Sequence, residues 1–344
     1  MFSFTKDIGM DLGTASVLIY IKDKGIVLNE PSVVALDKNT GKLLKVGADA
    51  QAMLGRTPGN IIAIRPLREG VISDYDMTER MLREFLHKVV GGFQLFKPRV
   101  IICVPSGITE VEERAVIDAG IQAGARRVYL IEEPVAAAIG AGIDITQPEG
   151  HMIIDIGGGT TDIAVLSLGG KVKATSVRVA GNHYDEEILK FVRNKFSIAI
   201  GQRTAENLKK NVACCPQKTD FHETMEIKGR SLLTGLPVRV TVSTDDLYEP
   251  VMMLSEQIGT AAHQVLEKTP PELAGDIYRN GVMLTGGGAQ LHGLTEYLSQ
   301  ELKVEVTVSP DPVNCVALGT AQSLSLGDKL ETGFTDATPR IGRR

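Results

Sequence analysis

Short apolar segments open the chain and predict a β-meander. Residues 8–11 and 17–21 are two such segments separated by a tight turn, and extended segments continue through residues 25–36. A similar pattern restarts at residue 151, in segments 152–155, 163–168 and 171–179. We interpret this recurrence as a duplicated unit.

Apolar residues at helical spacing follow each meander. Residues 77–90 show this spacing, and the continuous apolar run at 100–104 predicts a buried strand. Further helices are predicted at 111–123, 185–196, 203–213, 246–268 and 313–324, and further strands at 128–131 and 281–284. Strands that alternate with helices predict an α/β fold, and 344 residues favour two lobes or domains.

Composition narrows the class of protein. The net charge of −5 is small and no basic block is present, which argues against nucleic acid as a main partner. The four cysteines have no Cys-x-x-Cys spacing, so a zinc site has little support. No signal peptide or long apolar run is found, and we expect a cytoplasmic protein with reduced thiols.

Each meander contains a turn rich in glycine and hydroxyl residues. The first turn is Gly13, Thr14, Ala15 and Ser16, after Asp11, and the second is Gly157, Gly158, Gly159, Thr160 and Thr161, after Asp155. Because glycine has no Cβ, backbone N–H groups in such turns can approach phosphate oxygens closely. One turn alone could be an ordinary hairpin, but the pair predicts a two-sided grip on nucleotide phosphates.

The aspartate before each turn points to a bound cation. A bare carboxylate would repel phosphate, and Mg²⁺ held through water removes this conflict. We therefore predict that Asp11 and Asp155 face one shared Mg²⁺ ion. A third turn, formed by Gly286, Gly287, Gly288 and Ala289, follows an apolar strand and could let a nucleoside lie flat against the backbone.

Together these motifs resemble the superfamily of actin, Hsp70 and the sugar kinases. The two phosphate turns, Glu132-Glu133-Pro134 before an alanine-rich helix, and the turn that begins at Thr285 occur in the order of that superfamily. The segments NEPSVVALD, GRTPGN, IRPLREGVISDY, GQRTAENLK and KTPPEL are more narrowly similar to the MreB-type bacterial actins, including their Mbl-like relatives. This resemblance extends from about residue 8 to about residue 326.

The resemblance implies an actin-like ATPase fold of two lobes, each with an RNase H-like large subdomain and a small α/β subdomain. The first large subdomain would comprise residues 1–32, 67–141 and 317–344, and the first small one residues 33–66. The second lobe would combine 142–180 with 256–316 in its large subdomain and use 181–255 for its small one. ATP and Mg²⁺ would bind between the lobes.

The resemblance also implies a function and further binding residues. It predicts an ATP-dependent cytoskeletal filament that determines rod shape and guides peptidoglycan synthesis, with slow hydrolysis. Its expected partners are other copies in double protofilaments, the inner face of the cell membrane and the cell-wall elongation machinery. Helix residues Glu206, Asn207, Leu208 and Lys209 would contribute to the nucleoside site, and Glu206 and Lys209 share one helical face.

Hydrolysis needs a polar group that orients water toward the γ-phosphate. A carboxylate at a strand-to-helix turn that faces the phosphates is suited to this role. The resemblance implies that Glu133 is that residue, because the Glu-Glu-Pro position in this superfamily places a Glu near the metal and water, and Thr160 would help to hold the same water. Glu132 is the alternative carboxylate. A purely structural role for Glu133, as a charge at a helix amino terminus, also stays open.

Large apolar side chains in two exposed segments predict a membrane contact. Phe93, Leu95 and Phe96 stand together in one loop beside Lys97, while Phe2 and Phe4 lie near the amino terminus. The alternative is that the loop phenylalanines pack into the core. Because each subunit would bury few side chains, attachment is expected to depend on many subunits in a filament.

Two other functions in the same superfamily remain as alternatives. An Hsp70-like ATPase would need a peptide-binding domain, for which the sequence offers no segment. A sugar or acetate kinase would need a substrate base, and no aspartate in a suitable turn is found beyond those assigned to the metal.

Overall fold

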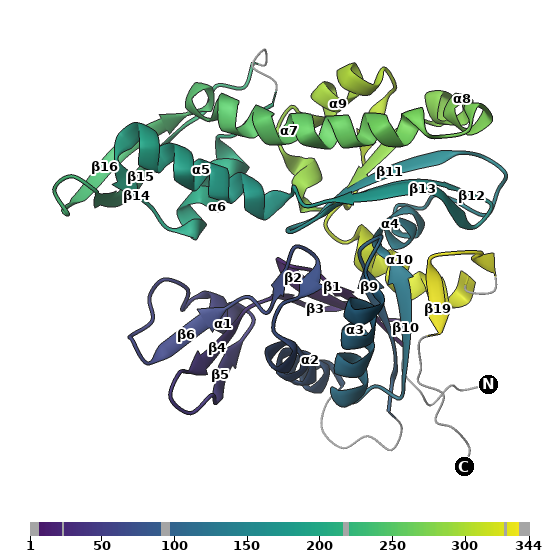
Figure 1. Cartoon of the computed structure of the whole chain (residues 1–344), viewed down its shortest axis with the longest axis horizontal. Coiled ribbons are helices and arrows are strands. Elements are labelled where there is room, and N and C mark those ends of the chain that lie inside the picture. Colours follow the sequence, from purple (N-terminus) through teal and green to yellow (C-terminus); the bar gives the residue numbers. More distant parts are fainter. Residues whose placement is uncertain (1–6, 23, 91–96, 216–219, 327–328, 337–344) are drawn as a thin grey trace.

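Two stacked lobes, each built around one large sheet, form the described part of the chain. The computed structural model describes residues 7–22, 24–90, 97–215, 220–326 and 329–336. In Figure 1 the first lobe, in purple and blue, lies below the second, in green. Sheets and helices occur together in both lobes, so the predicted α/β class is confirmed.

The large sheet of the first lobe has the order β19-β10-β9-β1-β2-β3. Its strands are β1 (Asp7–Leu12), β2 (Ser16–Ile21), β3 (Gly25–Pro31), β9 (Arg99–Val104), β10 (Arg127–Glu132) and β19 (Phe334–Asp336). The first three form the predicted antiparallel meander, and β9 and β10 continue the sheet in parallel. Helices α2 (Tyr75–Val90) and α3 (Glu110–Gln122) cover one face and share a core with it.

The large sheet of the second lobe repeats this arrangement in the order β13-β12-β11-β17-β18. Its strands are β11 (His151–Ile156), β12 (Thr161–Ser167), β13 (Gly170–Val177), β17 (Val282–Thr285) and β18 (Val306–Val308). Again a three-stranded meander continues into two parallel strands, so the duplicated unit is present in the topology. Its helices include α7 (Thr244–Glu267), α8 (Pro271–Asn280) and α9 (Leu294–Leu302).

Two helices, α4 (Glu133–Gly140) and α10 (Cys315–Leu326), lie between the large sheets (Figure 1). They pack backbone to backbone, because a Cβ added at Gly319 would lie 1.7 Å from the carbonyl oxygen of Ala136. Small residues therefore permit the close approach of these two helices.

A small sheet extends each lobe at the same end, on the left of Figure 1. The small sheet of the first lobe is formed by β4 (Val34–Asp37), β5 (Leu43–Val46) and β6 (Ile61–Ile64), with the short helix α1 (Ala48–Gln51) beside it. The small sheet of the second lobe is formed by β14 (Ile198–Ala199), β15 (Thr224–Ser231) and β16 (Pro237–Ser243), and the helices of this region are α5 (Gly181–Phe196) and α6 (Gln202–Asn211). A tight hairpin of β7 (Leu67–Arg68) and β8 (Val71–Ile72) completes the strands. Within the described residues, no helix combines the length and the apolar character needed to cross a bilayer.

Candidate functional site

A cavity of about 560 Å³ lies between the lobes. Such a volume is typical of small-molecule sites in proteins. The predicted residues that line the cavity are Asp11, Gly13, Thr14, Ala15, Ser16, Glu133, Asp155, Gly157, Gly158, Gly159, Thr160, Glu206, Lys209, Gly286, Gly287 and Gly288. All three glycine-rich turns therefore contribute to one cavity.

The two predicted phosphate turns lie directly against each other. A Cβ added at Gly158 would lie 2.5 Å from the Cβ of Ala15, so only glycine fits at this point of contact. The second turn is fixed from behind, because Gly181 and Asn182 at the start of α5 donate backbone hydrogen bonds to the carbonyls of Gly157 and Gly158, at 3.0 and 2.8 Å. The turns thus form two adjoining walls of the cavity.

The β7–β8 hairpin, which sequence analysis did not predict, supports the first turn. Its Gly70 N–H donates a hydrogen bond to Thr14 Oγ1 at 2.8 Å, and Gly70 itself lines the cavity. The adjacent Glu69 has a positive φ of 49° and forms an ion pair of 3.0 Å with Arg178 of the second lobe. This hairpin therefore contacts both lobes at the cavity.

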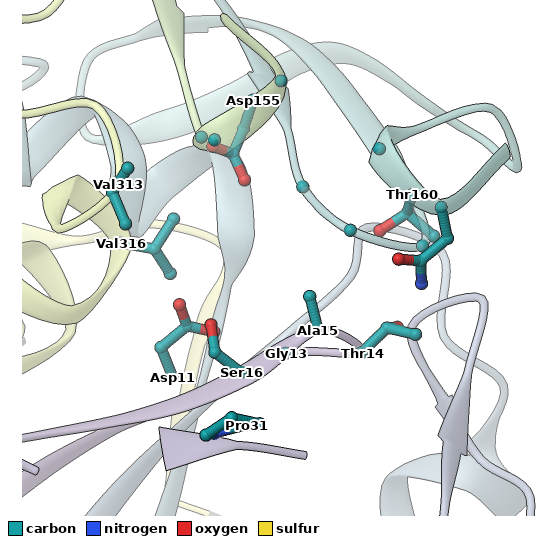
Figure 2. Close-up of a pocket in the computed structure, with 18 of the residues that line it drawn as sticks. Asp11, Gly13, Thr14, Ala15, Ser16, Pro31, Asp155, Thr160, Val313 and Val316 are labelled. Carbon is teal, nitrogen blue, oxygen red and sulfur yellow. The ribbon is translucent and has the colours of Figure 1, made fainter. Parts of the chain in front are cut away.

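Asp11 and Asp155 approach the same space from opposite walls, as Figure 2 shows. Desolvation raises the pKa of each carboxyl group from 3.8 to about 7. Thr285 Oγ1 donates a hydrogen bond of 2.8 Å to Asp155, and no ion pair is formed by either aspartate within the described residues. Two desolvated carboxylates that lack a basic partner fit a cation between them.

The donor set also limits how a metal could be bound. No group of three or more His, Cys, Asp or Glu side chains that could hold a metal ion occurs in the described ranges. Mg²⁺ commonly binds through one or two carboxylates, several waters and substrate phosphates. Asp11 and Asp155 on their own match that mode, and they do not match a metal site made only of protein ligands.

The two neighbouring glutamates have different surroundings. Glu133 is 8% exposed and lines the cavity at the start of α4, where burial, followed by the nearby aspartates Asp162, Asp155 and Asp11, raises its carboxyl pKa well above the ordinary value. Glu132 accepts hydrogen bonds from Ser106 Oγ at 2.8 Å and from Lys171 Nζ at 2.5 Å. Glu132 is therefore held outside the cavity, and only Glu133 remains available to act within it.

Asp162 is a buried carboxylate that sequence analysis did not assign. It is fully buried, and burial raises its pKa to about 6 although the backbone N–H of Ser106 donates a hydrogen bond to it. It lies directly opposite Asp155 in the β11–β12 pair and next to Glu133. The register of the predicted hairpin already implied this pairing and could have identified it.

The opposite end of the cavity is lined by α6 and by residues near it. Lys209 Nζ donates to the Gly181 carbonyl at 2.8 Å and pairs with Asp185 at 2.8 Å. Glu206 pairs with Lys210 at 2.6 Å. Arg65, which the sequence did not reveal, also lines this end, and burial lowers its pKa while Glu206 and Asp185 partly offset that effect. These charged groups are suited to polar contacts with a nucleoside.

Four of the predicted binding residues do not line the cavity. Leu208 is fully buried in the second-lobe core and Asn207 is exposed, because only every third or fourth residue of α6 faces the cavity. Ala289 packs in the same core as Leu208. Thr161 is buried, and its hydroxyl donates to the Val179 carbonyl at 2.6 Å.

The predicted membrane residues Phe2, Phe4, Phe93, Leu95 and Phe96 lie outside the described residues. Their roles therefore stay predictions.

Known structures identify the class of protein to which this fold and cleft belong. The structure is similar to that of MreB 5 of Spiroplasma citri bound to AMPPNP, with a TM-score of 0.89 and 38% identity over 95% of this chain and 98% of that one. It also resembles the MamK double helical filament, with a TM-score of 0.77 and 22% identity over 93% of this chain and 99% of that one. The chain thus has the actin-like ATPase fold.

Sequence comparison narrows this class to one family. The chain is 52% identical to the cell shape-determining protein Mbl of Bacillus subtilis, over 95% of this chain and 98% of the relative. It is 46% identical to the cell shape-determining protein MreB of Escherichia coli K12, over 94% and 95%. Residues 5–332 match the MreB/Mbl protein family. The chain therefore belongs to the MreB/Mbl family.

Proposed function

We propose that the chain binds ATP with Mg²⁺ between its lobes, hydrolyses it slowly and assembles into filaments on the inner face of the cell membrane. The observation that supports this most strongly is the pair of adjoining phosphate turns, with Asp11 and Asp155 facing one space between them. The Spiroplasma citri relative was crystallised with AMPPNP and with ADP, which supports an adenine nucleotide as the ligand.

The residues around the cavity suit each part of such a nucleotide. Backbone N–H groups of the two turns would donate to phosphate oxygens, while Glu206, Lys209 and the 286–288 turn would contact the nucleoside. Asp11 and Asp155 would hold Mg²⁺ through water, and the ion would supply neutralisation of the phosphate charge. Bound nucleotide would in turn hold both lobes together.

Hydrolysis would depend on Glu133 and Thr160. Glu133 borders the cavity beside Asp155, and its raised pKa makes it a better proton acceptor than an ordinary glutamate. The Thr160 side chain points into the same space from the second turn and would orient the attacking water (Figure 2). These residues offer the water only orientation and a weak carboxylate base, so slow turnover is expected.

Self-assembly is supported by an exposed apolar hairpin. Leu232, Leu233 and Leu236 at the β15–β16 turn are 40%, 85% and 63% exposed. Clusters of exposed leucines are typical of protein contact sites, and a filament would cover this one with another copy. The MamK relative forms a double helical filament. Assembly of this chain would let it guide peptidoglycan synthesis along the membrane, together with the cell-wall elongation machinery.

Electron microscopy on lipid monolayers tests these parts together. We expect filaments with ATP and Mg²⁺ and none when EDTA replaces Mg²⁺. Calorimetry that detects no Mg²⁺-dependent ATP binding by the folded chain would refute the nucleotide site. A folded chain that hydrolyses ATP and yet shows no polymer by light scattering at any concentration would favour the Hsp70-like or kinase alternative.

A further inference from the structure

Basic side chains from distant parts of the sequence meet at one end of the first-lobe sheet. Ile8 pairs with Ile21 in the β1–β2 register, so the turn that carries Lys22 and Lys24 lies where β1 begins. In the parallel pairs, Asp7 and Arg127 both lie opposite Arg99. The strands β1, β9 and β10 therefore start at one edge, and we call their surrounding basic residues the basic rim.

The basic rim consists of Lys22, Lys24, Lys97, Arg99, Arg126 and Arg127. The N–H of Arg126 donates to the Pro98 carbonyl at 2.8 Å, which places Arg126 next to the segment that carries Lys97. These contacts complete one continuous edge.

Most of the basic rim is free to bind an external anion. Arg99 forms two hydrogen bonds of 2.7 Å with Asp7, and Arg127 is held by Tyr129 and Asp336. Lys22, Lys24, Lys97 and Arg126 are exposed and form no ion pair within the described part of the chain. The carboxylates Asp7 and Asp336, with Asp23 between the two lysines in the sequence, are three negative charges against six positive ones. The edge is thus net positive on a chain whose overall charge is −5.

The connectivity of the chain links this edge to the apolar segments. Segment 1–6 leads directly into Asp7, and segment 91–96 leads directly into Lys97. Those segments contain the phenylalanines and the leucine for which we predict membrane contact. Apolar side chains flanked by basic ones are characteristic of surfaces that bind anionic bilayers, whereas nucleic-acid binding does not call for the apolar part.

We propose that the basic rim binds the phosphate groups of anionic phospholipids and so restricts attachment to anionic bilayers. This inference rests on the proposed membrane attachment. The ammonium groups of Lys22, Lys24 and Lys97 would bind headgroup phosphates as point charges, and Arg126 would bind them through its planar guanidinium fork. Each basic residue near such a surface is worth roughly a fivefold change in binding.

Vesicle flotation of the full chain with ATP and Mg²⁺ tests the proposal. The vesicles contain phosphatidylcholine alone or mixed with phosphatidylglycerol, each at low and at high salt. We expect flotation with the mixed vesicles at low salt and much less in the other conditions. The variant K22E/K24E/R126E should lose at least about tenfold of its flotation on mixed vesicles.

Two further variants serve as controls. K173E/K303E changes two exposed lysines of the second lobe and should float like the wild type. K22R/K24R/R126K keeps the charge and should also float normally. Light scattering without vesicles should show normal polymers for every variant. If the reversed charges impair assembly, the neutral variant K22Q/K24Q replaces them in the same assay and should still lose several-fold.

Each other outcome is informative. Equal wild-type flotation on both vesicle types at both salts would overturn the role of the rim, while the proposed membrane attachment would stand on its apolar segments. Flotation with neither vesicle type would overturn the attachment itself. Normal flotation of a polymer-forming K22E/K24E/R126E variant that has lost binding to duplex DNA would also overturn the proposal and assign the rim to nucleic acid.

Discussion

The backbone N–H of Ser106 in the first lobe donates a 2.8 Å hydrogen bond to Oδ1 of Asp162 in the second. Asp162 also lies opposite Asp155 in its sheet and beside Glu133. One buried carboxylate thus joins a contact between the lobes to the group expected to orient water. Relative movement of the lobes should therefore alter the position of Glu133.

Replacing Asp162 by Asn tests this link. The asparagine oxygen can still accept the bond from Ser106, but the negative charge that helps to raise the pKa of Glu133 is removed. We expect kcat to fall by roughly tenfold with little change in KM for ATP. The acid limb of the kcat–pH profile should shift to lower pH, because Glu133 would lose its proton more readily. An unchanged profile would show that Asp162 has only a structural role.

The two adjacent glutamates give a matched pair of variants. Glu133→Gln should reduce ATP hydrolysis by roughly a hundredfold or more while ATP binding persists, since the amide cannot accept the proton of the water. Glu132→Gln should leave the hydrolysis rate nearly unchanged, because Glu132 binds Ser106 and Lys171 outside the cavity. Phosphate release measured at saturating ATP distinguishes the two. Equal losses in both variants would contradict the assignment.

The sequence predicted those site residues whose chemistry is local. Asp11 and Asp155 were recognisable because each stands at a strand end before small residues, a pattern that can be seen in the sequence without knowledge of tertiary contacts. The pairing of Asp162 with Asp155 follows from the hairpin register, but its link to the other lobe was missed, since that depends on Ser106 and Glu133 in distant elements. Leu208 was included because motif resemblance covers a contiguous segment, but it packs in the second-lobe core, since a helix presents only one face to the cavity.

In the fold, too, elements with a strong local sequence signal were predicted and elements without one were missed. Most strands of the two large sheets were predicted from their apolar segments, but β18 and β19, of three residues each, were missed. Among the small-sheet strands, β5 and β6 have only four residues, although β6 is apolar throughout, and β15 is exposed at every second residue. Helix ends differ by a few residues from the predicted ends where side-chain caps determine them. For α7, Ser243 accepts a hydrogen bond from the Asp246 N–H and so starts the helix earlier than its apolar pattern suggests.

The raised pKa values of Asp11 and Asp155 predict how the nucleotide-free chain responds to pH. The pKa of each carboxyl group rises from 3.8 to about 7 on folding. The folded chain is therefore most stable, as far as these two groups are concerned, below about pH 4, and it loses that stability as the pH rises through 7. Asp155→Asn should remove part of this loss and stabilise the chain at pH 8 by roughly 1–3 kcal/mol. It should also abolish Mg²⁺-dependent ATP binding.

Urea unfolding at pH 5 and pH 8 without nucleotide checks this expectation. The difference in unfolding free energy between the two pH values should be smaller for Asp155→Asn than for the wild type. Asp49→Asn is the control, because Asp49 is exposed and forms an ion pair with Lys45 on the surface. If Asp155→Asn were no more stable than the wild type at pH 8, the carboxylate would not be the destabilising group.

Contact between the two phosphate turns predicts a strong effect of one methyl group. Gly158→Ala would place a Cβ 2.5 Å from the Cβ of Ala15, so the turns must separate. We expect ATP affinity to fall at least tenfold, since overpacking of this kind typically costs roughly 1–3 kcal/mol. Gly275→Ala in α8 meets no atom within 4 Å and should bind ATP normally. Calorimetric titration with Mg²⁺ and ATP measures both, and unchanged affinity in Gly158→Ala would contradict the two-sided grip.

The leucines of the β15–β16 turn predict a variant that separates assembly from nucleotide binding. Leu233 is 85% exposed and far from the cavity, so Leu233→Ser should retain ATP affinity and folding stability. If another copy covers this side chain, its loss removes roughly 1.5–3 kcal/mol per contact and should raise the critical concentration for assembly about tenfold or more. Val111→Ser is the control, because Val111 is similarly exposed, at 78%, and lies on α3 of the other lobe. It shows whether the loss of any exposed apolar side chain raises the critical concentration. Sedimentation across a range of protein concentrations gives the critical value for each variant. A Leu233→Ser chain that polymerises at the wild-type concentration would mean that the hairpin faces solvent in the filament.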